Sequence, residues 1–146
     1  MDTRTSLNDS RKSILATLWI FATLNYLYCD IVGFMDSSLL AQYITGLVNG
    51  MHLSAGFLLG GSVLMEIPMS MILVSKVMKR EPNRILNIVA GSIMTLVQCA
   101  SILSSPPTMY YAFFSIVEVA CTATIVFYAS RWRTVEVAAP GGLFVD

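Results

Sequence analysis

The lysine and arginine residues of this chain are confined to three short segments. They fall within residues 4–12, 76–84 and 131–133, and the stretches 13–75 and 85–130 contain none. Each of these stretches is long enough to cross a bilayer twice, because one transmembrane helix needs about 20 residues. Only 12% of the residues are charged, about half the usual share of a soluble domain. The sequence therefore predicts a small integral membrane protein, and it excludes a secreted disulfide scaffold, a disordered chain and a nucleic-acid binder.

The apolar runs predict an all-α fold, an integral membrane four-helix bundle in one domain at residues 13–133. Transmembrane helices are expected at about residues 13–35, 51–77, 85–103 and 108–130. Residues 1–12 form an N-terminal segment, and residues 134–146 are expected to be a flexible C-terminal tail. The short connections favour an up-down-up-down arrangement of the four helices.

Four spans would place both termini and the middle loop on the side that carries every basic residue. The positive-inside rule makes that side cytoplasmic, so the expected topology is N-in and C-in. The outer loop between spans one and two, residues 36–50, is too short to span and has polar and apolar residues on opposite helical faces. We expect it to form a short amphipathic helix, capped at its start by Asp36.

Each predicted span carries one strongly polar residue near the middle of the membrane. These residues are Asn25, Glu66, Gln98 and Glu118, one from each span in chain order. An ionised carboxylate at this depth costs about 3 kcal/mol on insertion scales. We therefore expect the four side chains to form one polar layer that holds a ligand or a proton. The alternative is that they only fix helix packing through hydrogen bonds.

Small and polar residues recur at helical spacing beside these positions. Gln98 and Ser101 lie on one face of span three, while Ser115 and Thr122 share a face with Glu118 on span four. The pattern predicts a polar seam between helices inside the bundle. Asp30 lies about 8 Å further out than Asn25 along span one, and it is a candidate for lining an entry path.

Three further residues are candidates for an entry path or a hinge. Pro68 follows Glu66 by two residues and leaves a backbone carbonyl free within span two. Tyr26 lies about one helical turn from Asp30, and His52 stands at the outer start of span two. Since His52 is the only histidine and there is no CxxC motif, we expect no metal and no cofactor.

Several of these residues belong to motifs that resemble a known family. The motifs are Asn25-Tyr26-x-Tyr28-x-Asp30, Met35-Asp36, Glu66-Ile67-Pro68 and Arg84-x-x-Asn87. Together they resemble an uncharacterised family of small bacterial four-span membrane proteins, classed as a domain of unknown function. The resemblance covers most of residues 13–130, implies a bacterial origin and four spans, and draws attention to Asp30, Glu66 and Pro68. We therefore expect the protein in the bacterial cytoplasmic (inner) membrane. The architecture also looks loosely DoxX-like.

The leading functional hypothesis is binding or transport of a small lipophilic or cationic molecule through the polar midplane site, with proton coupling as an option. Four spans are few for a complete transport path, so we expect a homo-oligomer. Membrane lipid is the other expected partner. One alternative is a non-catalytic accessory or structural subunit. Another is an enzyme that performs acid/base chemistry on a lipophilic substrate, although no residue pattern names a nucleophile.

Overall fold

A computed structural model describes residues 3–104 and 106–132. Over these residues the fold is helical apart from one small hairpin. The long helices are α1 (Thr3–Met35), α3 (Ala55–Val77), α4 (Arg80–Ser104) and α5 (Met109–Ser130). Each is long and apolar enough to cross a membrane, which confirms the prediction of four candidate spans. Residues 134–146, the expected C-terminal tail, lie outside the described residues.

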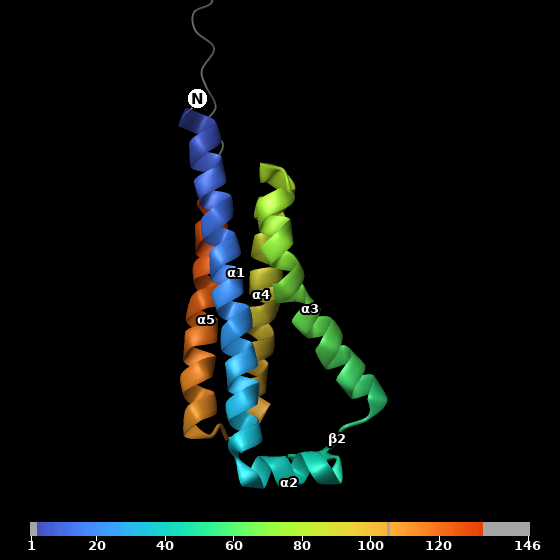
Figure 1. Cartoon of the computed structure of the whole chain (residues 1–146). Coiled ribbons are helices and arrows are strands. Elements are labelled where there is room, and N and C mark those ends of the chain that lie inside the picture. Colours follow the sequence, from blue (N-terminus) through green and yellow to red (C-terminus); the bar gives the residue numbers. More distant parts are fainter. Residues whose placement is uncertain (1–2, 105, 133–146) are drawn as a thin grey trace, which may run out of the picture.

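The connections alternate between two ends of the molecule. One end of the molecule carries the starts of α1 and α4 and the ends of α3 and α5 (Figure 1). We call it the basic end because Lys12, Lys76 and Arg84 lie towards it. The opposite end, which we call the α2 end, carries α2 (Ser37–Thr45) and the α4–α5 turn (Figure 1). The chain order therefore gives the up-down alternation that the sequence predicts.

The core lies between α1, α4, α5 and one half of α3. The buried residues of α1 recur every three or four positions, as expected for one face of a helix. Trp19 and Ile125 are fully buried, and Gly91 brings α4 close to α5. The cluster of buried apolar residues consists of Leu15, Trp19, Ala22, Tyr26, Met71, Ala90, Met94, Cys121, Ile125, Ala129 and Trp132.

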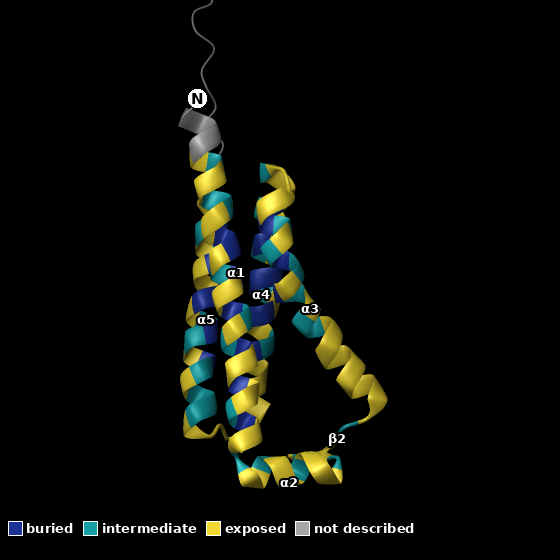
Figure 2. Ribbon diagram, viewed as in Figure 1, coloured by how far each residue is buried: buried dark blue, intermediate teal, exposed yellow. Residues whose placement is uncertain are grey.

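Helix α3 belongs to the bundle over only half of its length. Its buried residues are Pro68, Met71 and Ser75, all in the half nearer the basic end. Every residue from 55 to 63 is exposed, and this half leans away from the other helices (Figure 2). Pro68 removes one backbone hydrogen bond inside the helix, which accounts for the bend. The predicted four-helix bundle therefore includes α3 only over the half nearer the basic end.

The segment between α1 and α3 is also more divided than predicted. Helix α2 runs crosswise at the end of the bundle (Figure 1) and ends at Thr45, where Gly46 caps it with a positive φ of 71°. A hairpin follows, with β1 (Leu47–Val48) antiparallel to β2 (Met51–His52). Asn49 and Gly50 both have positive φ, and Asn-Gly is the preferred pair for such a turn. The short helix with its Asp36 cap is therefore present, at Ser37–Thr45, and it is followed by a hairpin that the sequence did not predict.

Candidate functional site

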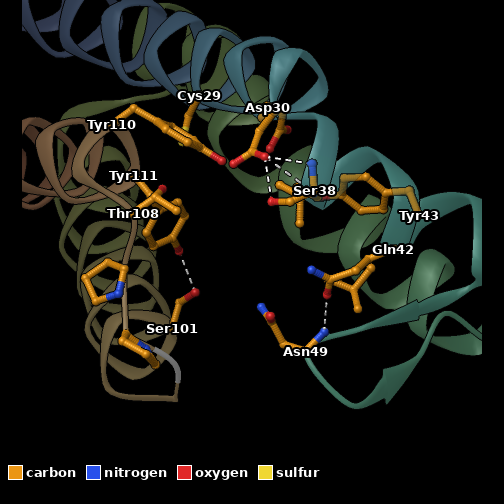
Figure 3. Close-up of a pocket in the computed structure, with 16 residues that line it drawn as sticks. Cys29, Asp30, Ser38, Gln42, Tyr43, Asn49, Ser101, Thr108, Tyr110 and Tyr111 are labelled. Atoms are coloured by element: carbon orange, nitrogen blue, oxygen red, sulfur yellow. Dashed lines mark hydrogen bonds between the residues drawn. The ribbon is translucent and has the colours of Figure 1, made fainter.

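A pocket of about 270 Å³ opens at the α2 end of the molecule. Five segments build it: α1, α2, the hairpin, the end of α4 and the start of α5 (Figure 3). Its lining includes two carboxylates, from Asp30 and Asp36, and three tyrosines, Tyr43, Tyr110 and Tyr111. None of its lining residues is basic. The pocket therefore combines negative charge with aromatic rings, which is an environment suited to a cation.

Asp36 has a structural role at the start of α2. One carboxylate oxygen, Oδ1, accepts hydrogen bonds from the backbone N–H of Ser38 at 3.0 Å and of Leu39 at 3.3 Å, and from the Ser38 hydroxyl at 2.7 Å. These bonds, the Ser38 hydroxyl first, lower the pKa of Asp36 below its ordinary value of 3.8, and Tyr110 adds a smaller effect in the same direction. Asp36 is thus both the predicted helix cap and an ionised group at neutral pH.

Asp30 lies on α1 towards the α2 end, and it contributes the second carboxylate of the pocket. The one salt bridge in the described part of the chain joins Arg80 and Glu81, so Asp30 forms no ion pair there. The Asp30 carboxyl therefore has no basic partner within that part of the chain. Tyr43 illustrates its influence, because burial and then the Asp30 charge raise the pKa of this α2 phenol.

Polar contacts continue from the pocket into the bundle along the α4–α5 interface. The hydroxyls of Ser101 and Tyr111 are 2.5 Å apart, and one turn deeper Gln98 Nε2 donates to Ser115 Oγ at 2.7 Å. The hydroxyl oxygens of Thr95 and Thr122 are 2.8 Å apart at the next level. These contacts form the polar seam that the residue spacing predicts.

Asn25 and Glu118 meet beside this seam. Asn25 Nδ2 donates to Glu118 Oε1 at 3.1 Å and to the Phe114 carbonyl at 3.2 Å. Glu118 lies near the middle of α5 and is only 1% exposed. It is seven residues beyond the pocket residue Tyr111, which corresponds to about 10 Å along the helix. The pair therefore places a buried carboxyl about two turns below the pocket.

Tyr26 adds an unsatisfied group at the same depth. Its side chain is 7% exposed, and its hydroxyl oxygen has no hydrogen-bond partner within the described ranges. Buried hydroxyls are normally paired, so this oxygen is available to a bound water or ligand. On α1 it lies one turn from Cys29, which lines the pocket.

The structure does not bring Glu66 into the polar layer. Glu66 is exposed on α3, whereas Asn25 and Glu118 face each other across α1 and α5. The buried residues of α3 are Pro68, Met71 and Ser75. At 100° per residue Glu66 lies on the opposite side of the helix, so its side chain faces away from the bundle. His52 is exposed in β2, and it does not line the pocket.

A second buried polar cluster lies nearer the basic end. Asn87 Oδ1 accepts from Trp19 Nε1 at 2.7 Å and from Ser75 Oγ at 3.3 Å. Asn83 Nδ2 donates to the Ser75 carbonyl at 2.7 Å, and Asn87 Nδ2 donates to Asn83. This cluster joins α1, α3 and α4. Sequence analysis missed it as a unit, although Asn87 belongs to the Arg84-x-x-Asn87 motif.

The side chains that most often bind metals are dispersed over residues 3–104 and 106–132. No group of three or more His, Cys, Asp or Glu side chains is placed there to hold a metal ion. Besides the two carboxylates, amides and hydroxyls line the pocket, among them those of Gln42, Asn49 and Ser101 (Figure 3). Gln42 Oε1 accepts from the Asn49 backbone N–H at 2.9 Å, which ties α2 to the hairpin.

The fold and this polar interior define a small helical membrane protein with four candidate spans. A family model places the chain more closely: it belongs to a family of unknown function (DUF6326), whose model matches residues 5–139. The resemblance to an uncharacterised family is thereby confirmed, while the likeness to DoxX-like proteins is not. Neither the curated proteins nor the solved structures contain a match to this chain.

Proposed function

We propose that this protein binds a small organic cation in the pocket at the α2 end. The observation that carries the proposal is a pocket with two carboxylates, three tyrosines and no basic lining residue. Tyrosine faces attract cations by about 0.5–2 kcal/mol each, depending on desolvation. An alkylammonium ion satisfies both features, because it carries charge for Asp30 and Asp36 and apolar surface for the rings.

The polar seam extends this proposal towards transport. Glu118 and Asn25 lie about two helical turns beneath the pocket, and hydroxyl and amide groups occupy the levels between them. A carboxyl so placed can exchange a proton when a cation arrives or leaves. We therefore infer proton-coupled movement of the cation, with Glu118 as the titrating group. Glu66 has no part in this step.

We also propose a location and an orientation, which the distribution of charge supports. Positive residues at one end of the helices favour the cytoplasmic side, so the basic end would face the cytoplasm of a bacterial inner membrane. The pocket would then open on the opposite side, towards the cation outside the cell.

Calorimetric titration of the protein in lipid nanodiscs tests the binding step. Tetramethylammonium is the probe, and tert-butanol is an uncharged molecule of similar bulk. The proposal predicts saturable heat for tetramethylammonium only. Equal binding of both molecules would contradict it by showing an apolar rather than a cationic site. Absence of binding for this probe and for primary alkylammonium ions would favour the accessory-subunit alternative.

Proton coupling has its own test. Addition of tetramethylammonium should release protons from the wild-type protein, measured with a pH-sensitive dye in weakly buffered detergent. The Glu118→Gln variant should bind the probe without releasing protons. Unchanged proton release by this variant would contradict the assignment of Glu118.

A further inference from the structure

Tyr26 and Glu118 occupy the middle of two helix faces that pack against each other. The buried positions are Trp19, Ala22, Tyr26 and Cys29 along α1, and Ser115, Glu118, Thr122 and Ile125 along α5. Spacings of three and four residues mark one side of each helix. Since α1 and α5 are in contact along their length, the side chains of Tyr26 and Glu118 both point into the bundle.

The two side chains also lie at the same level of the bundle. Cys121 Sγ donates to the Leu18 carbonyl at 3.4 Å. Asn25 Nδ2 donates to Glu118 Oε1 at 3.1 Å, so α1 passes Glu118 between Leu18 and Asn25. Aromatic side chains in a helix lean towards its N-terminus and cover the preceding turn. The Tyr26 hydroxyl therefore falls within this level, where the charge of Glu118 acts on it.

Both groups have unused capacity for hydrogen bonds. Within residues 3–104 and 106–132, the Asn25 amide is the one donor to the Glu118 carboxyl and it occupies Oε1, which leaves Oε2 without a donor. The Tyr26 hydroxyl is buried and has no partner in those ranges. An ionised carboxylate accepts bonds on both oxygens, and a buried charge is costly unless it is hydrogen-bonded. The free donor of Tyr26 thus complements the free acceptor of Glu118.

We propose that the Tyr26 hydroxyl donates a hydrogen bond to Glu118 Oε2 when this carboxyl is ionised, and so helps Glu118 to give up its proton. The role of this bond in transport rests on the proposed proton coupling. Asn25 keeps its bond to Oε1 throughout. Tyr26 retains its own proton and moves only close enough to reach Oε2, while the Glu118 proton leaves towards the pocket. Tyr26 acts through Glu118 and is therefore a positioning residue.

Difference infrared spectroscopy between acid and alkaline pH tests the bond in lipid vesicles without any cation. Bands that are missing in Glu118→Gln belong to Glu118. Tyr26→Phe keeps the ring and loses the hydroxyl, so it should shift the carboxylate bands of Glu118 and leave the carbonyl band of the protonated form in place. Tyr28→Phe is the matched control, because Tyr28 is 58% exposed on the same helix, and its bands should match the wild type. Unchanged carboxylate bands in Tyr26→Phe, or an equal shift in Tyr28→Phe, would overturn the proposal.

Thermal unfolding at acid pH separates this role from packing. While Glu118 is protonated, the Tyr26 hydroxyl has no partner to lose, so Tyr26→Phe should unfold at the wild-type midpoint or above it. A lower midpoint would overturn the proposal, because it would show that the hydroxyl is already bonded elsewhere.

The infrared result is independent of cation binding. If tetramethylammonium does not bind but the carboxylate bands shift in Tyr26→Phe, the hydrogen bond is supported and the proposed function fails. If tetramethylammonium binds and the bands do not shift, the proposed function stands and the role of Tyr26 is overturned. Where both hold, Tyr26→Phe should release fewer protons per bound tetramethylammonium than the wild type.

Discussion

Asn25 donates a hydrogen bond from Nδ2 to Oε1 of Glu118 at 3.1 Å, across the contact between α1 and α5. Since Glu118 is 1% exposed, loss of this donor would leave a buried carboxyl without its amide partner. Asn25→Ala should therefore lower the free energy of unfolding by about 0.6–2 kcal/mol. Thermal unfolding in detergent, followed by tryptophan fluorescence, measures the change.

Glu118→Gln is the matched control for this prediction. The glutamine keeps a carbonyl oxygen that can accept the Asn25 hydrogen bond, so its unfolding midpoint should stay close to that of the wild type. If Asn25→Ala unfolds at the wild-type midpoint, the bond does not contribute to stability.

Gly91 and Gly60 provide a second comparison. A Cβ at Gly91 would meet Val126 Cγ2 at 2.8 Å and the Thr122 carbonyl oxygen at 3.3 Å, whereas a Cβ at Gly60 would meet nothing within 4 Å. Gly91→Ala should destabilise the protein by about 1–3 kcal/mol through overpacking. Gly60→Ala should be neutral or stabilising by up to about 1 kcal/mol, because alanine favours helix. Equal unfolding midpoints for the two variants would contradict the close α4–α5 contact.

The Asn87 cluster predicts how α3 is attached. Asn87→Ala leaves Trp19 Nε1 without its acceptor at 2.7 Å and removes the acceptor of the Ser75 hydroxyl. The expected loss is about 1–3 kcal/mol, the usual cost of leaving a buried polar group unpaired. Amide hydrogen exchange should rise over α3 more than over α5. Thr124→Ala, which removes an exposed hydroxyl, should leave exchange unchanged in both helices.

Asp36 predicts a pH dependence at the start of α2. Its pKa is lowered in the folded protein by the Ser38 and Leu39 hydrogen bonds, so the cap contributes stability above the ordinary pKa and loses it as the pH falls through the folded value. The protection factors of the Ser38 and Leu39 amides, taken relative to the intrinsic exchange rate at each pH, should therefore fall only in acid. In Asp36→Asn these two amides should stay protected at every pH, because asparagine also caps a helix. In Asp36→Ala they should be unprotected at every pH. A wild-type profile that is flat in acid would contradict the capping role.

The number of candidate spans and much of the polar seam could be predicted because both depend on local sequence. Apolar run length identifies candidate spans, and 3.6-residue periodicity places Gln98, Ser115 and Glu118 on inward faces. Helix bounds were less accurate, since α4 begins at Arg80 rather than near residue 85. Charged residues are tolerated in a helix where it extends beyond the apolar run.

Three features depended on information that periodicity does not carry. The face that α3 turns to the bundle decides whether Glu66 meets Glu118, and apolar residues on all sides of this helix leave that face unmarked in the sequence. The pocket joins five separate segments, so its lining could not be read from any one of them. The hairpin had a local signal, Asn49-Gly50, which the amphipathic pattern of residues 36–50 obscured.

The most direct test of the cation site compares two acidic residues at opposite ends of the molecule. Asp30 lines the pocket, whereas Asp9 is exposed near the start of α1, at the basic end. Calorimetric titration with tetramethylammonium in nanodiscs should give a dissociation constant about tenfold or more weaker for Asp30→Asn, as expected from the loss of a charge-assisted contact. Asp9→Asn should bind as the wild type does. Equal affinity of Asp30→Asn and Asp9→Asn would contradict the proposed site.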